Sequence, residues 1–503
     1  MIETIIQAVQ QVTTFYAFLA MTLGAVIGLV LGAIPGLNGT MAIALLIPMT
    51  LYVSPWIGIP MILAIYKSAG WGGSISAILI GIPGNSPAVV IALDGYPMTK
   101  QGKAGKALRA TLYSGVAADT MSDLVTIFVC GPIATLALLI SPPEYALLFV
   151  MALAIIASLG DADPIKTIIS AALGLFVASI GYDLITQTQR LMFGILELGD
   201  GIKLIPMFIG MFALSECIYN FMNNNKDVSI SQVTLSTEAI HSTEKDNETY
   251  SFKEFWSHKF IILRSTAIGT IIGALPGIGS TVSPWVGYSM AKKTSKHPEK
   301  FGRGSIEGLV GAQAAGNSVA GANLIPLLTL GIPGDSVAAM LIGTMTVHGM
   351  QPGPLIMTRN TVDVYSIFVT LLYCDIIYFL VSLLAIKYGT KISKVSTTIL
   401  MPFIISMCVI GTYAINRSMF DVCVMFVLGI IGYVMKTYKY SMAAFMIAFI
   451  LGPLMEISLR QTLILFRGNI FGILTRPVSA IFFLIIILFI SIPIIARVTK
   501  IFK

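Results

Sequence analysis

Small polar residues stand beside glycine and proline at four places in an otherwise apolar sequence. They offer hydroxyl, amide and carboxyl oxygens next to uncovered backbone: Pro35, Gly36, Asn38, Gly39 and Thr40; Gly84, Asn85 and Ser86; Gly277, Gly279, Ser280 and Thr281; and Gly334, Asp335 and Ser336. Proline and glycine interrupt a helix and free N–H and C=O groups that hydrocarbon does not satisfy. We therefore expect these four interruptions to face protein, water or a ligand.

Binding of an anion is the chemistry expected at these interruptions. A helix that begins at one of them directs its unpaired N–H groups and the positive end of its dipole toward a carboxylate. Freed carbonyl and hydroxyl oxygens at the opposite half-helix ends suit Na⁺, which would neutralise substrate charge within the membrane. The alternative is that glycine and proline only permit kinks or close packing. Four matched interruptions favour the binding interpretation.

Two further acids are candidates for coupling transport to a cation. Asp119 and Asp123 are one helical turn apart in the apolar segment 112–140, so they share a helix face. Acids at that depth are costly unless they are paired, protonated or part of an ion path. The alternative is a position near the interface or a bond to a neighbouring helix end. Lys67 and Asp375 are interpreted as structural partners.

The interruptions recur in the two halves of the chain. Pro35 matches Pro276 at an offset of 241 residues, and Pro83 matches Pro333 at an offset of 250. A polar segment rich in Ser, Thr, Asn and mixed charge lies between the two copies. The sequence therefore predicts a first transmembrane repeat over 1–222, an interdomain linker over 223–259 and a second transmembrane repeat over 260–503.

Charge predicts that the repeats have inverted topology. After the first interruption, the second half is basic over 292–303, whereas 51–62 in the first half contains no charged residue. After the second interruption the bias reverses, with four basic residues over 100–109 against Arg359 alone over 343–359. Short basic loops stay in the cytoplasm, so equivalent loops would lie on opposite faces. The alternatives are that the four loops show this charge pattern by chance or that one loop has moved. The basic carboxyl end, 497–503, is then expected to be cytoplasmic.

Composition predicts an all-α integral membrane protein. Hydrophobic residues make up 56% of the chain, charged residues 11%, and the mean hydropathy is +0.87. The apolar runs predict roughly ten to twelve spans, including broken helices. The net charge of +7 comes from short loops beside spans, so no nucleic-acid partner is expected. We find no phosphate loop, catalytic motif or paired cysteines, and we expect neither an enzyme nor a bound cofactor or metal.

Several longer phrases resemble the large membrane subunit of tripartite tricarboxylate transporters, the TctA family. They extend over most of the chain: Gly73-Ser-Ile-Ser-Ala-Ile-Leu-Ile-Gly-Ile-Pro83-Gly, Ala92-Leu-Asp94-Gly-Tyr-Pro, Pro326-Leu-Leu-Thr-Leu-Gly-Ile-Pro333-Gly and His348-Gly-Met-Gln-Pro-Gly-Pro354. The resemblance implies a multi-pass transporter of the bacterial inner membrane. It also implies a small membrane subunit (TctB-like) and a periplasmic solute-binding protein (TctC-like) as partners.

The resemblance further implies import of di- or tricarboxylates such as citrate, with Na⁺ as the expected coupling ion, and binding at the four interruptions. Asp335 beside an anion would be unfavourable unless a cation lies between them, so it joins Asp119 and Asp123 as a candidate for cation coupling. Two alternatives stay open. One is an anion channel or uniporter. The other is a membrane-embedded enzyme, which would need a catalytic group among Asp119, Asp123 and Ser86.

Overall fold

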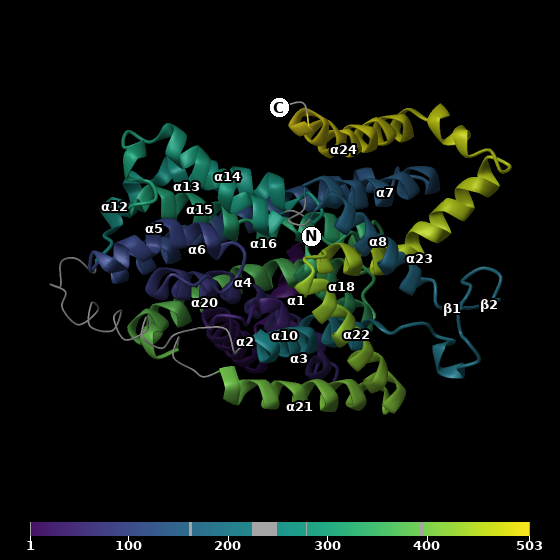
Figure 1. The fold of residues 1–503 in the computed structure, drawn as a ribbon, viewed down its shortest axis with the longest axis horizontal. Helices are drawn as coiled ribbons and strands as arrows, with labels where there is room; N and C mark the ends of the chain where they lie inside the picture. Colours follow the sequence, from purple (N-terminus) through teal and green to yellow (C-terminus); the bar gives the residue numbers. More distant parts are fainter. Residues whose placement is uncertain (1, 160–162, 224–248, 278, 393–396, 502–503) are drawn as a thin grey trace.

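The computed structural model describes residues 2–159, 163–223, 249–277, 279–392 and 397–501, and these are mostly helical (Figure 1). The first half contains α1 (Ile2–Val12), α2 (Phe15–Ala33), α3 (Gly39–Thr50), α4 (Pro55–Ile80), α5 (Ala88–Lys100), α6 (Ala104–Ala137), α7 (Pro142–Leu159), α8 (Pro164–Ala178), the two-residue strands β1 (Gly181–Tyr182) and β2 (Gln189–Arg190), the 3₁₀ turn η1 (Leu196–Leu198), α9 (Leu204–Phe208), the π-helix η2 (Ile209–Leu214) and α10 (Ser215–Asn223).

Residues 224–248 of the predicted linker 223–259 lie outside the described residues, and the second half begins with α12 (Phe252–Ser257), which falls within that predicted linker. This half also contains α13 (Lys259–Gly273), α14 (Gly279–Thr294), η4 (Pro298–Lys300), α15 (Ile306–Asn317), α16 (Val319–Ala322), α17 (Leu324–Leu330), α18 (Ser336–Val347), α19 (Ile356–Arg359), α20 (Thr361–Ile392), α21 (Thr397–Asn416), α22 (Met419–Thr437), α23 (Met442–Leu465), η5 (Ile470–Thr475) and α24 (Pro477–Ile501).

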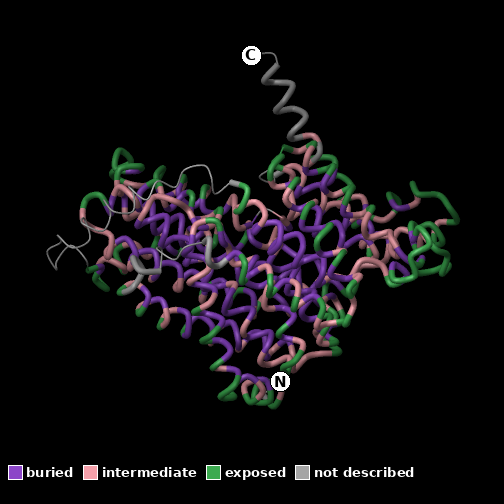
Figure 2. The backbone as a smooth tube through the Cα atoms, turned by 60° about the horizontal axis from the view of Figure 1, so that its bottom comes forward, coloured by how far each residue is buried: buried purple, intermediate pink, exposed green. Residues whose placement is uncertain are grey.

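Length and exposure identify the molecule as a multi-pass membrane protein, which confirms the predicted fold class. Six of the described helices are long and apolar enough to cross a bilayer, and six shorter helices are also apolar. Large apolar side chains such as Phe15, Phe128 and Leu139 are more than 75% exposed. Figure 2 shows buried residues through the middle of the bundle and exposed residues on its outer faces. Lipid accounts for these outer apolar side chains because water would not favour them.

All four predicted interruptions are real breaks between helices. The first half breaks between α2 and α3 and between α4 and α5, and the second half between α13 and α14 and between α17 and α18. Gly81 and Gly331 end α4 and α17 in the left-handed conformation, each with φ of 71°. Glycine adopts this conformation at little cost, so the Gly-Ile-Pro-Gly phrase stops the helix in both halves.

The two halves repeat the same glycine packing. In α2, Gly28 lies against the backbone of Ile65 and the hydroxyl of Ser68 on α4. In α13, Gly269 lies against the backbone of Ala315 and the hydroxyl of Ser318. The glycines differ by 241 residues and their partners by 250, the offsets found in the sequence. Small residues allow this close approach of helix backbones, so the repeat in sequence is also a repeat in packing.

Loops from the two halves meet at one end of the molecule. Asp94 on α5 accepts hydrogen bonds at Oδ1 from the backbone N–H groups of Gly302, Gly304 and Ser305, at 2.8–2.9 Å. The side-chain amide of Gln101 donates to the carbonyl of Arg303 at 2.9 Å. Figure 1 shows α5 and α6 beside α13–α15 at this end. The basic segments 100–109 and 292–303 therefore lie on the same side of the molecule.

Candidate functional site

The two interruptions of the first half are packed together. The backbone N–H of Gly84 donates to the carbonyl of Gly73 at 3.3 Å, and Gly84 also lies against the carbonyl of Gly32 near the end of α2. The Asn85 side chain donates to the carbonyls of Ala69 and Gly70 at 3.1 and 3.2 Å. These bonds satisfy carbonyls within α4 and fix the turn before α5, which begins three residues later.

The two interruptions of the second half are also joined. The N–H of Gly277 donates to the carbonyl of Gly334 at 2.5 Å. Gly334 lies against the side chain of Asn323, and Gly279 lies close to the same side chain. In each half, therefore, the two predicted interruptions contact each other. The two motifs that are paired in sequence are also neighbours in the structure.

The predicted binding residues differ in exposure. Gly36 and Ser86 are exposed, and Gly84, Gly279 and Gly334 are buried. The remaining predicted positions are half-buried: Pro35, Asn38, Gly39, Thr40, Asn85, Gly277, Ser280, Thr281, Asp335 and Ser336. Buried glycines permit the close packing, whereas the polar side chains at the interruptions are only partly covered by protein.

Helix capping distinguishes the two halves. Asn38 caps α3, its side-chain oxygen accepting from the N–H of Met41 at 2.9 Å, and Asn85 accepts from the N–H of Ala88 at 3.0 Å. Asp335 caps α18 and accepts from the N–H of Ala338 at 2.8 Å. Both asparagine side chains are neutral, whereas a carboxylate already occupies the positive end of α18.

Asp335 also joins the two halves. Its second oxygen accepts from the hydroxyl of Tyr66 on α4 at 2.9 Å, and the Asn323 side chain donates to the same hydroxyl at 2.6 Å. Both carboxylate oxygens thus have donors. The helix cap and the tyrosine account for an acid at this position, and a role as a cation ligand stays a prediction.

A buried ionic cluster lies one residue beyond Tyr66. The Lys67 ammonium donates to Asp123 on α6 and, at 2.5 Å, to Asp375 on α20. Lys67, Asp123 and Asp375 are each at most 2% exposed. The second oxygen of Asp375 accepts from Thr120 at 2.9 Å. Lys67 and Asp375 are thus ion-paired with each other, and Lys67 is also paired with Asp123, a predicted coupling residue; their purely structural role stays a prediction.

Asp119 belongs to the same cluster but has a different partner. One of its oxygens accepts from the Asn317 side-chain amide at 2.9 Å, and Asn317 also donates to the Tyr378 hydroxyl at 3.1 Å. The other oxygen of Asp119 is buried without a hydrogen-bond partner among the described residues. Within these described ranges, no three His, Cys, Asp or Glu side chains are arranged to hold a metal ion.

Lys67, Asp375, Tyr66 and Asn323 were not predicted as site residues. Lys67 is separated in sequence from its two acids by 56 and 308 residues, so no local motif joins them. A usable signal was nevertheless present. Buried charges in membrane helices require a partner, and the only lysine within the apolar region 41–80 should have been matched with the acids of the spans.

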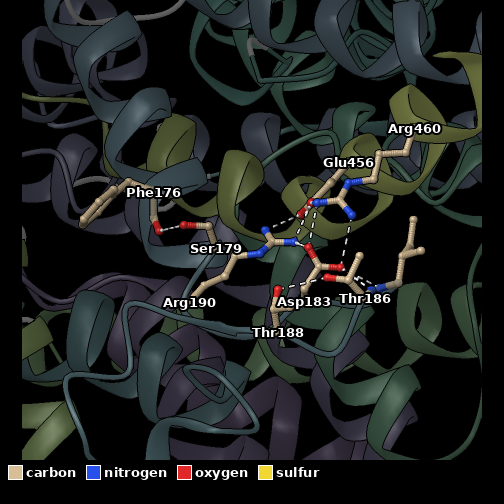
Figure 3. Close-up of polar contacts among 9 residues, drawn as sticks. Phe176, Ser179, Asp183, Thr186, Thr188, Arg190, Glu456 and Arg460 are labelled. Atoms are coloured by element: carbon tan, nitrogen blue, oxygen red, sulfur yellow. Dashed lines mark hydrogen bonds and ion pairs between the residues drawn. The ribbon is translucent and has the colours of Figure 1, made fainter. Parts of the chain in front are cut away.

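A second ionic cluster, also missed, fixes the segment between α8 and α9. Asp183 accepts from Arg190 on β2 and from both terminal nitrogens of Arg460 on α23, at 3.1 and 2.6 Å (Figure 3). Arg190 also forms a two-point contact with Glu456, at 2.7 and 3.1 Å. Two guanidinium groups and two carboxylates thus balance one another, away from the interruptions. We interpret this cluster as structural.

Replacement of Asp183 by alanine is expected to loosen the 181–203 segment. Asp183 is 3% exposed and also accepts from the N–H groups of Ile185 and Thr186. Its loss leaves Arg190 and Arg460 sharing the one carboxylate of Glu456, at a cost of about 1–3 kcal/mol. Limited proteolysis of purified protein should cut this segment faster. Glu197→Ala, at an exposed position of the same segment, should leave the cleavage rate unchanged, and equal rates in both variants would contradict the prediction.

The architecture defines a class of protein: a multi-pass membrane protein with paired helix breaks and charged residues in its core, as in secondary transporters. Residues 18–447 match the model of the tripartite tricarboxylate transporter TctA family. The chain belongs to this family, which confirms the predicted resemblance. Members of this family are membrane components of tripartite tricarboxylate transporters.

Two relatives from Agrobacterium vitis are similar to the chain. An uncharacterized 52.8 kDa protein in the TAR-I ttuC' 3' region is 33% identical over 458 residues, covering 91% of this chain and 89% of the relative. An uncharacterized protein in the TAR-II ttuC' 3' region is 35% identical over 212 residues, covering 42% of this chain and 88% of the relative. No solved structure matches the chain significantly.

Proposed function

We propose that this chain is the translocating subunit of an importer of di- or tricarboxylates, driven by a cation gradient with Na⁺ as the expected coupling ion. The observation that carries the proposal is the pairing of two helix breaks within each half, with a neutral asparagine cap, Asn38, at α3 and the neutral Asn85 side chain bonded to the first N–H of α5. Backbone N–H groups at helix starts favour carboxylates. Family membership supports the tripartite arrangement, with a small membrane subunit and a periplasmic solute-binding protein as partners.

Inverted topology of the repeats is part of this proposal. In inverted repeats, the helix after the second break of one half ends on the same side as the helix after the first break of the other. These helices are α5 and α14, and the contacts of Asp94 and Gln101 join the segments that follow them. Both segments are basic, so this side would be cytoplasmic in a bacterial inner membrane. The carboxyl end would lie there too, and its residues 502–503 are outside the described residues.

Transport would then proceed by alternating access, with one unit built from the repeats moving against the other helices. Asp119, Asp123 and Asp335 would couple this motion to the cation. The buried cluster supports such a role because α4, α6 and α20 from both halves meet at Lys67. Any change in the charge of this cluster would alter the contact between the halves.

Uptake of labelled citrate and related carboxylates into membrane vesicles tests the proposal. The vesicles contain this chain and its small subunit, with or without the binding protein, under an imposed Na⁺ or proton gradient. Uptake that requires the binding protein and a gradient is expected. Flux that ignores every cation gradient would instead indicate a channel or uniporter.

Asn85→Ala and Ser280→Ala are each expected to reduce this uptake, by about tenfold for Asn85. Asn85 makes three hydrogen bonds at the break, and a loss of about 1.4 kcal/mol corresponds to tenfold. Asn469→Ala is a matched control because Asn469 is exposed and far along the chain beside η5. Normal uptake by both site variants, at equal amounts of inserted protein, would refute the proposed binding site.

A further inference from the structure

Lys67 and Asn317 occupy equivalent positions in the two repeats. They differ by the 250 residues that separate Pro83 from Pro333. The next residues, Ser68 and Ser318, both face the equivalent glycines of α2 and α13. Equivalence at this point therefore rests on packing as well as on sequence.

The same contact between the halves occurs twice in the cluster. Lys67, on α4 of the first half, donates to Asp375 on α20 of the second half. Asn317, on α15 of the second half, donates to Asp119 on α6 of the first half. Asp119 and Asp375 are both in the long helix that follows the second break of their repeat, 15 and 14 residues from the starts of α6 and α20. Each acid thus meets the broken helix of the opposite repeat.

Only one of these two contacts has its own cation. Asp375 faces an ammonium, whereas Asp119 accepts from a neutral amide, although both acids are at most 2% exposed. The second oxygen of Asp119 has no hydrogen-bond partner in the described part of the chain. Lys67 is also ion-paired with Asp123, so its single positive charge is already shared by two carboxylates, and Asp119 is a third. A buried carboxylate without compensation is strongly disfavoured.

We infer that Asp119 binds a monovalent cation, a proton or Na⁺. In the contact between Asn317 and Asp119, this cation plays the part that the Lys67 ammonium plays in the equivalent contact with Asp375. This inference rests on the proposed cation-coupled transport and specifies where the cation acts. The titratable groups that face Asp119 are Tyr66 and Lys67 from α4, Asp123 from α6, and Asp375 and Tyr378 from α20. Gln313 and Asn317 of α15 are neutral.

A chain of hydrogen bonds runs from Asp119 to Ser74 on α4, which is next in sequence to Gly73 at the interruptions of the first half. Asn317 accepts from the Gln313 amide at 2.7 Å, and the Gln313 oxygen accepts from Ser74 on α4 at 2.7 Å. The next residue back, Gly73, accepts at its carbonyl from the N–H of Gly84. Loading or emptying Asp119 changes which donors its carboxylate needs, and this chain carries the change to the proposed substrate site.

Thermal unfolding of the purified chain, in detergent without substrate or partner subunits, tests the site directly. A cation that binds only the folded state raises the midpoint as its concentration increases. One series adds Na⁺ at constant ionic strength, with choline as replacement, and a second series lowers the pH without Na⁺. We expect the wild type to respond in one series, which identifies the cation. Asp119→Asn should lose that response, and the exposed-acid control Glu197→Gln should keep it.

The Asn317→Lys variant tests the same inference independently. An ammonium at this position would replace the cation, so this variant should be folded without Na⁺ or acid and should show at least a tenfold weaker dependence on either. A response retained by Asp119→Asn or Asn317→Lys, or no response of the wild type in either series, would overturn the inference. The unfolding assay does not depend on transport, so the cation site and the proposed function can fail separately. If the variants lose the response but vesicle flux ignores every cation gradient, the proposed function is refuted and the cation site stands.

Discussion

Replacement of Lys67 by methionine is expected to cause the largest loss of folded protein of any single change in the core. Lys67 is the ammonium that Asp123 and Asp375 share, and all three side chains are at most 2% exposed. Without it, three carboxylates including Asp119 remain buried together. Removing one partner of a buried ion pair costs about 3–5 kcal/mol, and here two pairs are broken by one substitution.

The measurement is the yield of monodisperse protein from membranes and its thermal midpoint, followed by vesicle uptake. Lys293→Met is the matched control because it removes an exposed lysine and should behave as wild type. A triple variant, Lys67→Met with Asp123→Asn and Asp375→Asn, removes the ammonium with both of its acids and should recover much of the folded yield. If Lys67→Met alone gave normal yield and stability, charge compensation would not be what holds α4, α6 and α20 together.

The breaks were predictable from sequence because proline and glycine act locally. Gly81 and Gly331 stop their helices through backbone conformation alone, and neighbouring residues suffice to recognise the phrase. The residues at which helices begin were harder to predict from the sequence. The continuous apolar run over 41–66 covers α3 and the first part of α4, because a new helix starts at Pro55 where hydropathy shows no interruption.

The buried pair Asp119 and Asp123 was also predicted, but its environment was not. Helical spacing places both acids on one face, whereas their partners come from α4 and α15 and are distant in sequence. The same holds for Asp335. Sequence alone made an acid beside an anion site appear unfavourable, yet its oxygens are occupied by Ala338 and Tyr66. Sequence therefore located the charges, and only the tertiary structure assigned their partners.

Matching equivalent positions of the two repeats helps to predict which charges lack a charged counterpart. Once Pro83 is matched with Pro333, the offset alone pairs Lys67 with Asn317 and shows that a charge in one repeat is an amide in the other. Differences between equivalent positions mark where a duplicated protein has become asymmetric. A transporter that binds one substrate and one cation requires such asymmetry, because strict equivalence would create two identical sites.

Replacement of Gly84 by alanine is expected to reduce uptake by tenfold to about a hundredfold. A methyl group at this position would overlap the backbone carbonyl of Gly32 and lie 2.9 Å from the Cα atom of Gly73. Backbone cannot rotate away as a side chain can, so the two breaks of the first half must separate, at about 1–3 kcal/mol for overpacking. At Gly334, the equivalent position, the added methyl group meets the Asn323 side chain, which can move. Gly131→Ala has open space around it and serves as the control within α6. Vesicle uptake should therefore fall in the order Gly131→Ala, Gly334→Ala, Gly84→Ala, and a Gly84→Ala variant as active as Gly131→Ala would show that contact between the breaks is not needed for transport.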